Sequence, residues 1–342
     1  MEELEKVTLE LGYGGFTTRK FIKQEVLSRF GNPSLQDFED GSYVSMAGIE
    51  CVLTTDSYIV DPPVFPGGDI GRLAVSGTIN DLVASGATPL FLTMGLVISE
   101  GFSIGHLHKI LDSMATTAQE SGIQIVAGDT KVVPKSCNLG ICINTTGLGL
   151  PVRPFFRFRL ADALAGDKII ITGTLGDHAL AILSEREGLG FEHRVHSDCA
   201  PLNSLILPLL SQIHGIHSLR DPTRGGFAGV LHDLAEATGL VVHVERMRVP
   251  IEPEVRFGCE MLGLDPLEMV NEGKMVVIVS AAHADRTLRS LRDHVLGRQA
   301  AIVGEVRRPD SVESSSKVII MEADGSELLL DRLEGERLPR MC

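Results

Sequence analysis

Apolar residues recur along the first half of the chain with two different periods, which predicts alternating strands and helices. Continuous apolar runs predict strands at 50–55, 90–98, 123–127 and 141–148. Apolar positions spaced three or four residues apart predict a short helix at 20–30 and a longer one at 71–86. A further helix begins after Ser103, a good N-cap residue, and ends at Gly122.

The second half repeats this alternation, so the fold class is predicted to be mixed α/β. Strands are expected at 168–172, 241–245, 274–280 and 301–306, and helices at 202–213, 227–238, 253–263 and 283–296. Asp324-Gly325 is a strong signal for a two-residue hairpin turn. Prolines interrupt the pattern at 149–160. We therefore expect an N-terminal glycine-rich segment and two domains, followed by a hairpin with a mobile tail, at 1–40, 41–152, 153–310 and 311–342.

Composition and charge narrow the function classes. The 342 residues suffice for two domains with sizeable cores. A net charge of −14 argues against binding to nucleic acid or to anionic membranes. No apolar run has membrane-spanning length, residues 1–10 lack the apolar region of a secretory signal, and the six cysteines form no CxxC pair. These features predict a reduced, cytoplasmic protein.

Several familiar site motifs are missing from the sequence. It has neither a Walker A motif nor a GxGxxG motif, which excludes P-loop ATPases and dinucleotide-binding dehydrogenases. The pairs His106/His108 and His193/His196 have no companion ligands in the sequence. We interpret them as surface or structural histidines, with a metal site as the less favoured alternative.

Aspartates form the most informative pattern. Asp56, Asp69, Asp129 and Asp221 follow apolar strands or lie in glycine-rich turns, and Asp81 joins them from a helix. Ligands bind at strand ends in α/β sheets, and oxygen-only ligand sets suit Mg²⁺. Lys131 could neutralise charge on a transferring phosphoryl group. Each aspartate alone is more typical of a turn or a helix cap, but their shared kind of position favours a site.

Two further segments have both a chemical and a structural interpretation. The turn from Gly12 to Gly15 could present N–H groups to an anion, or could be a simple N-terminal loop. Glu272 lies in Asn271-Glu272-Gly273-Lys274 just before a strand. It is either a solvated turn residue or a general base.

The motifs taken together resemble the HypE family of hydrogenase maturation factors, within the aminoimidazole ribonucleotide synthetase (PurM-like) superfamily. They occur in order along the chain: Thr54-Thr55-Asp56-Ser57, Phe65-Pro66-Gly67-Gly68-Asp69-Ile70-Gly71, Asn80-Asp81, Gly128-Asp129-Thr130-Lys131-Val132-Val133, Gly173-Thr174-Leu175-Gly176-Asp177-His178, Arg220-Asp221-Pro222-Thr223-Arg224-Gly225-Gly226 and Asn271-Glu272-Gly273-Lys274. The final Pro339-Arg340-Met341-Cys342 is the most specific part of this resemblance. One departure is Leu11, which stands where the family usually has a His before its first glycine.

The resemblance implies a PurM-like two-domain fold, with barrel-forming strands in the N-terminal domain and a mixed sheet covered by helices in the C-terminal domain. It also implies ATP and Mg²⁺ as cofactors and a homodimer whose N-terminal strands form a shared barrel. The implied Mg²⁺ ligands are Asp56, Asp81, Asp129 and Asp221. The implied cofactor contacts are these four with Asp69, Asn80, Gly128 and Thr130.

The implied activity is ATP-dependent dehydration of a carbamoyl group carried on Cys342 to a thiocyanate. Glu272 would be the base, and Lys131 would stabilise charge or share the proton transfer. A HypF-like carbamoyltransferase would load Cys342. The HypC–HypD complex would pass the cyanide ligand on to the iron of [NiFe]-hydrogenase.

Two other functions remain open on the sequence. One is another enzyme of the superfamily, similar to selenophosphate synthetase or aminoimidazole ribonucleotide synthetase, which would not need Cys342. The other is a non-catalytic scaffold whose tail docks a partner, which would not need Lys131, Glu272 and the aspartates together. Taken alone, Cys342 could also be a frayed chain end without function, which is the default for termini.

Overall fold

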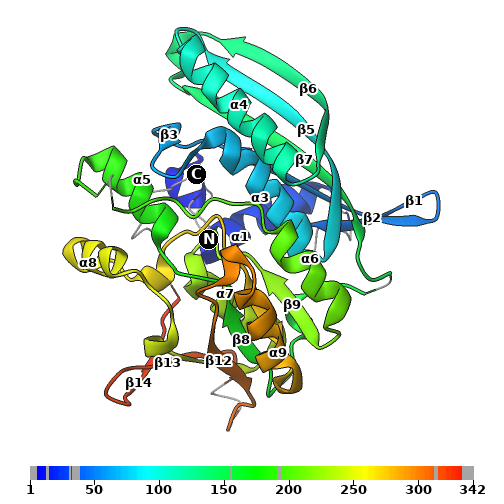
Figure 1. Cartoon of the computed structure of the whole chain (residues 1–342), viewed down its shortest axis with the longest axis vertical. Coiled ribbons are helices and arrows are strands. Elements are labelled where there is room, and N and C mark those ends of the chain that lie inside the picture. The colour runs from blue at the N-terminus through cyan, green and yellow to red at the C-terminus, as the bar shows by residue number, and fades with distance from the viewer. Residues whose placement is uncertain are drawn as a thin grey trace.

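The computed structural model describes residues 6–12, 15–30, 32, 39–154, 156–191, 194–311 and 315–332. They form two α/β halves, each built on its own sheet, which meet around the helix α3 (Figure 1). This arrangement confirms the predicted α/β class with a mixed C-terminal sheet. Among the described helices, none combines the length and the apolar character needed to cross a membrane.

The N-terminal sheet has five strands in the order β1-β2-β7-β5-β6. They are β1 (Ser42–Met46), β2 (Ile49–Tyr58), β7 (Ile141–Pro151), β5 (Ala87–Ser99) and β6 (Gln124–Val133). Only β5 and β6 pair in parallel, and β6 is an edge strand. The helices α3 (Ile70–Ala84) and α4 (Ile104–Glu120) pack together, and α3 lies against β2, β5 and β7. A two-stranded ribbon of β3 (Val64–Phe65) and β4 (Gly68–Asp69) precedes α3.

The C-terminal sheet has seven strands in the order β14-β13-β10-β12-β8-β11-β9. They are β14 (Glu327–Leu329), β13 (Val318–Met321), β10 (Val241–Glu245), β12 (Ala301–Arg307), β8 (Lys168–Ile171), β11 (Val276–Val279) and β9 (Ile216–Arg220). Its pairs are antiparallel except β10–β13, so the sheet is mixed. The helices of this half are α5 (Asp177–Glu187), α6 (Asn203–Gln212), α7 (Gly226–Thr238), α8 (Pro253–Leu262) and α9 (Ala281–Arg292).

The described N-terminal segment forms a short helical unit. It contains a 3₁₀ turn (Leu9–Gly12), α1 (Gly15–Phe21), a π-helical turn (Ile22–Leu27) and α2 (Ser28–Phe30). Arg19 on α1 contacts Asp233 on α7, with 2.6 Å between Nη2 and Oδ2. The opposite carboxylate oxygen of Asp233 lies 3.1 Å from Nη2 of Arg332, which follows β14. One carboxylate therefore holds segments from both ends of the described chain.

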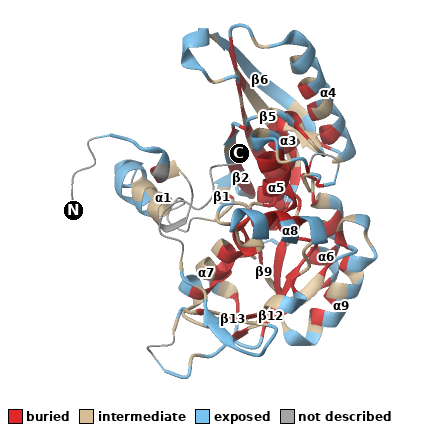
Figure 2. Ribbon diagram, turned by 90° about the vertical axis from the view of Figure 1, so that its left-hand side faces the viewer, coloured by how far each residue is buried: buried red, intermediate tan, exposed pale blue. Residues whose placement is uncertain are grey.

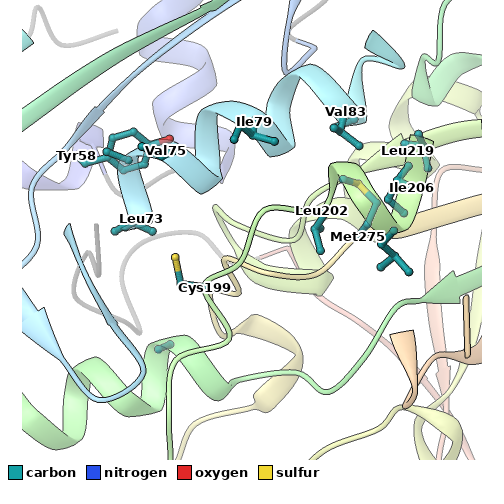
Figure 3. Packing of buried hydrophobic residues seen from close by; sticks show 14 of the residues in the cluster. Tyr58, Leu73, Val75, Ile79, Val83, Cys199, Leu202, Ile206, Leu219 and Met275 are labelled. Carbon is teal, nitrogen blue, oxygen red and sulfur yellow. The ribbon is translucent and has the colours of Figure 1, made fainter. Parts of the chain in front are cut away.

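The helix α3 is the structural centre of the molecule. Its residues are buried except Arg72, because one face meets the N-terminal sheet while α4, α6 and β9 cover other faces. Apolar residues occur on all sides of α3, which is typical of such a buried position. Val83 of α3 shares a core with Leu202, Ile206, Leu219 and Met275 of the C-terminal half (Figure 3). The buried residues form a continuous zone across both halves, as Figure 2 shows. The halves are therefore joined by hydrophobic packing as well as by the chain.

Most predicted elements are present, and the differences concern their ends. The hairpin at Asp324-Gly325 forms and continues the C-terminal sheet through β13. The strands β2 and β6 extend beyond the predicted 50–55 and 123–127, so Asp56 and Asp129 lie inside strands rather than after them. The prediction that these two aspartates follow the ends of their strands is wrong. A strand can continue through polar residues when they lie on one face of the sheet. Four strands were not predicted: β1, β3, β4 and β9.

Candidate active site

Three carboxylates meet where the two halves join. Oxygens of Asp40, Asp81 and Asp221 lie within 4.8 Å of one another. Asp40 precedes β1, Asp81 lies on α3, and Asp221 follows β9. Among the described residues, this is the one group of three or more potential metal-ligating side chains that gathers at such distances. The residues come from three separate segments, so the site depends on the assembled fold.

Residues of β2 extend this acidic cluster. Oγ1 of Thr54 lies 2.8 Å from Oδ2 of Asp81 and 2.8 Å from the carbonyl oxygen of Asp40. Asp56 is a neighbour of Asp81, and each of the two carboxyl groups influences the pKa of the other. The hydroxyl of Tyr58 donates to Oδ2 of Asp56 over 3.3 Å. Because side chains alternate along a strand, Thr54, Asp56 and Tyr58 all point toward α3.

Burial makes the negative charge of this cluster costly. Burial, followed by repulsion from Asp40, raises the pKa of Asp221 to about 8. Burial, followed by repulsion from Asp56, Asp221 and Asp40, raises the pKa of Asp81 well above its ordinary value. Burial also raises the pKa of Asp56, and the Arg224 guanidinium opposes this shift. The cluster therefore favours either protons or a cation.

Two arginines supply part of the compensating charge. Arg220 is buried and pairs with Asp40, and its Nη2 lies 3.3 Å from Oε2 of Glu39. Nη2 of Arg224 lies 3.4 Å from Oδ1 of Asp56. These contacts use oxygens of Asp40 and Asp56, while Asp81 and Asp221 face each other inside the cluster. Carboxylate oxygens with no sulfur or imidazole among them suit a hard divalent cation such as Mg²⁺.

Glu272 lies beside this cluster in a buried loop before β11. Its side chain is 4% exposed, so the interpretation as a solvated turn residue is wrong. Burial raises the pKa of Tyr58 most, and the negative charges of Asp56, Asp81 and Glu272 raise it further, in that order. The charge of Glu272 also raises the pKa of Cys199, after burial of that thiol. The carbonyl oxygen of Glu272 accepts a hydrogen bond from Nδ2 of Asn80 over 3.2 Å, and Asn80 precedes Asp81 on α3. The Glu272 loop therefore lies next to the acidic cluster.

Asp69 occupies a different environment from the clustered aspartates. It is the N-cap of α3, where Oδ1 accepts hydrogen bonds from the N–H groups of Gly71 (2.7 Å) and Arg72 (3.0 Å). Asp69 is not among the carboxylates that gather at the described acidic cluster. The structure therefore gives Asp69 the capping role that is typical of aspartate before a helix.

Gly128, Asp129, Thr130 and Lys131 lie on the edge strand β6. One row of paired residues crosses four neighbouring strands: Asp56 on β2, Thr145 on β7, Met94 on β5 and Gly128 on β6. Three strand spacings therefore separate Gly128 from Asp56, roughly 14 Å. Asp129 and Lys131 alternate with that row. Thr145 faces α3, with its Oγ1 3.0 Å from the carbonyl oxygen of Ala74.

It follows that Asp129 and Lys131 project from the opposite face of the sheet, and both are exposed. Within one chain they do not join the acidic cluster. Within one chain Asp129 therefore does not reach the described acidic cluster, because β6 continues past it and turns it away from α3. Its role as a Mg²⁺ ligand stays a prediction.

Some predicted site residues lie outside the described residues. These are Cys342 with the rest of its Pro-Arg-Met-Cys segment, and Tyr13 and Gly14 of the glycine-rich turn. Leu11, directly before the first glycine of that turn, is described and buried. Its side chain is apolar and gives the turn no group for hydrogen bonding to an anion.

Asp40 is the site residue that sequence reasoning missed. It lies in Glu39-Asp40-Gly41, directly before the first strand of the sheet. An acidic pair followed by glycine at the start of a strand was a possible signal, but it is a common surface pattern. The pairing of Arg220 with Asp40 is a tertiary contact over 180 residues.

The comparisons with known proteins match this architecture. Residues 39–150 match the family model "AIR synthase related protein, N-terminal domain", and residues 165–317 match the model of its C-terminal domain. A relative from Cupriavidus necator, named carbamoyl dehydratase HypE, is 41% identical over 98% of this chain and 95% of its own length. The chain belongs to the HypE family.

Solved structures of HypE proteins agree with the HypE family assignment. A crystal structure of a HypE–HypF complex contains a chain 41% identical to this one, with a TM-score of 0.85 over 92% of this chain and 99% of that one. A crystal structure of HypE in complex with ATP gives 41% identity and a TM-score of 0.83 over 98% of this chain and 100% of that one. The predicted PurM-like fold is thereby confirmed.

Proposed function

We propose that this chain is an ATP-dependent carbamoyl dehydratase that makes a thiocyanate on Cys342 for the maturation of [NiFe]-hydrogenase. The observation that supports this function most directly is the convergence of Glu272 and the acidic cluster in one buried site. A relative named carbamoyl dehydratase HypE matches 98% of this chain, and a solved HypE structure has the same fold. The HypE structure solved with ATP supports ATP as the phosphoryl donor.

Asp40, Asp81 and Asp221 would hold Mg²⁺, with Asp56 beside them. The cation would neutralise the β- and γ-phosphates of ATP and lower the cost of their approach to a carboxylate-rich site. Arg224, next to Asp56, adds positive charge at the same point. Burial of the cluster strengthens these attractions, because water screens them less.

The dehydration needs both a phosphoryl acceptor and a base. The thiocarboxamide oxygen on Cys342 attacks the γ-phosphorus atom, and ADP leaves. The nitrogen loses its two protons and the C–O bond to phosphate breaks, which yields inorganic phosphate and an S–C≡N group. Glu272 is the proposed base, because its carboxyl group lies in the buried part of the site.

Asp129 and Lys131 would enter the reaction through a homodimer. The face of the N-terminal sheet opposite α3 carries the exposed apolar side chains of Leu53 and Phe91. An edge strand beside an uncovered apolar face is suited to pairing with another chain. A second copy joined along this face would give the shared barrel expected of the superfamily. Lys131 of one chain would then assist the site of the other.

The substrate group on Cys342 would come from a HypF-like carbamoyltransferase, and the product would pass to a HypC–HypD complex. The HypE–HypF crystal structure, with a chain 41% identical to this one, supports the first partner. The second partner is proposed from the family resemblance alone.

Mass spectrometry of the peptide that ends in Cys342 tests the proposed reaction. The full-length chain would be incubated with a carbamoyltransferase, its carbamoyl donor and ATP. We expect a carbamoyl adduct that becomes a cyano adduct only when ATP is present. Glu272→Gln should accumulate the carbamoyl adduct. Full conversion by Glu272→Gln would remove Glu272 as the base, and ATP turnover without any adduct would favour another superfamily enzyme.

A further inference from the structure

We infer that Asn80 is a positioning residue that fixes the main chain at Glu272 and couples it to the acidic cluster. Asn80 and Asp81 are neighbours on the buried helix α3. Asp81 contributes to the cluster, whereas Asn80 reaches across to loops of the C-terminal half. This inference rests on the proposed function only in taking Glu272 as the base.

The amide of Asn80 has a defined partner for each of its hydrogens. Nδ2 donates to the carbonyl oxygens of Ala200 (3.1 Å) and Glu272 (3.2 Å), and Oδ1 accepts from the N–H of Leu202 (2.8 Å). The residue is 2% exposed, so water does not replace these bonds. A buried amide that joins two carbonyls and one N–H is difficult to substitute, because other side chains of its size lack two donors and an acceptor.

Asp198 fixes the N–H group of Glu272, the residue whose carbonyl oxygen accepts from Asn80. Oδ1 of Asp198 accepts a hydrogen bond from the N–H of Glu272 over 3.0 Å, and its Oδ2 lies 3.2 Å from Nζ of Lys274. A Cβ atom on Gly273 would lie 1.8 Å from the carbonyl oxygen of Asp198, so the two loops pack without space for a side chain. The N–H and the C=O of Glu272 are therefore both fixed, by Asp198 and Asn80 respectively.

This arrangement links two steps of the proposed reaction. A shift of α3 that moves Asp81 also moves Asn80, because consecutive residues of a buried helix move together. Asn80 transmits that shift to the peptide at Glu272 through a direct hydrogen bond. The proposed base is thereby positioned relative to Asp81 of the cluster, although Asp81 and Glu272 belong to different halves of the chain.

The inference differs from the prediction that Asn80 contacts the cofactor. Both amide hydrogens are donated to the protein, and Oδ1 already accepts one hydrogen bond. A cofactor contact would affect binding of ATP, whereas a positioning role would affect the chemical step. Kinetic measurements can therefore distinguish the two roles of Asn80.

The test is single-turnover dehydration of the carbamoylated full-length chain, with the cyano adduct on Cys342 measured by mass spectrometry across ATP concentrations. Asn80→Ala should slow the step at saturating ATP by about 100-fold, because small misplacements of a catalytic group have effects of this size. The ATP concentration at half-saturation should change less than about threefold. If Asn80→Ala does not fold, Asn80→Ser keeps one donor and should show a smaller slowing with the same pattern.

Asn203→Ala is the matched control. Nδ2 of Asn203 also donates to a main-chain carbonyl of the other half, that of Ser121 (3.0 Å), but it holds no part of the Glu272 loop. This variant should lose a comparable hydrogen bond and keep the parental dehydration rate. Equal slowing in both variants would indicate a general loss of domain packing and would overturn the inference.

Three further outcomes are decisive. A higher ATP concentration at half-saturation, with an unchanged maximal rate, would show that Asn80 contacts the cofactor and would overturn the positioning role. A parental rate in Asn80→Ala, together with an inactive Glu272→Gln, would overturn the inference and leave the proposed function intact. Full activity of Glu272→Gln would instead overturn Glu272 as the base, and with it the premise on which the inference rests.

Discussion

The acidic cluster and the edge strand β6 carry aspartates that look alike in the sequence and differ completely in the fold. Asp81 and Asp221 are buried, and their oxygens lie with one of Asp40 within 4.8 Å. Asp129 is exposed on β6 and faces away from α3. The comparison shows that the sequence can mark an aspartate as a candidate ligand, while sheet register and tertiary packing decide whether it converges with others.

The largest expected effect comes from the cluster itself. Asp81→Ala should slow dehydration roughly 1,000-fold, because a cation that stabilises phosphoryl transfer contributes several kcal/mol. The conversion of carbamoyl to cyano adduct at saturating ATP measures this effect. A rate within tenfold of the parent would show that the cluster does not serve the reaction.

Mixing two inactive variants would test the comparison between the cluster and β6 most sharply. If Lys131 serves the site of a second copy, Asp81→Ala and Lys131→Ala chains should restore one intact site in each mixed dimer. Random mixing should then recover about a quarter of the parental activity. Recovery of no activity, despite mixed dimers shown by native mass spectrometry, would place both residues in the site of one chain.

The pH dependence of stability tests the electrostatics of the cluster. The folded-state pKa of Asp221 is about 8 and its unfolded value is about 3.9, so the folded chain binds the extra proton between these values. The free energy of unfolding should therefore fall as pH rises through this window, by up to about 1.4 kcal/mol per unit. Urea unfolding in EDTA at pH 6, 7 and 8 measures the slope.

Asp221→Asn is the control for this pH effect, and it should flatten the slope because the titrating group is removed. Mg²⁺ with ATP should oppose the loss of stability at pH 8, since ligating carboxylates are deprotonated. An unchanged slope in Asp221→Asn would assign the titration to another group.

Asp233 offers a smaller effect away from the active site. Asp233→Ala removes the carboxylate shared by Arg19 and Arg332, whose guanidinium groups lie 2.6 and 3.1 Å from its oxygens. These contacts are partly exposed, so we expect a loss of roughly 1 kcal/mol in the free energy of unfolding. Glu236→Ala removes the more exposed partner of Arg332 and should cost less. The reverse order would show that Asp233 is not the main anchor.

Asp69 should show the smallest functional effect of the predicted aspartates. Asp69→Ala removes the N-cap of α3 and should lower the free energy of unfolding by about 1 kcal/mol, which thermal unfolding can measure. Asp69→Ser keeps a capping oxygen and should restore most of that loss. A large rise in the ATP concentration for half-saturation in both variants would instead place Asp69 at the nucleotide.

The fold was largely predictable because its elements have strong local signals. Apolar spacing located α3 and α4, and Asp324-Gly325 located the hairpin of β13 and β14. The strand β9 was missed because its alternation is short, and its last residue, Arg220, is a buried charge. Burial of Arg220 depends on Asp40, which no local pattern relates to it.

The sequence by itself determined the two-domain α/β plan, the family and the set of residue types that the chemistry needs. Only the tertiary structure decided which of these residues converge. It added Asp40, turned Asp129 and Lys131 to the opposite sheet face, and gave Asn80 main-chain partners at Ala200, Glu272 and Leu202. The physical reason is that helix and strand signals act over a few residues, whereas convergence depends on sheet register and on packing between distant segments.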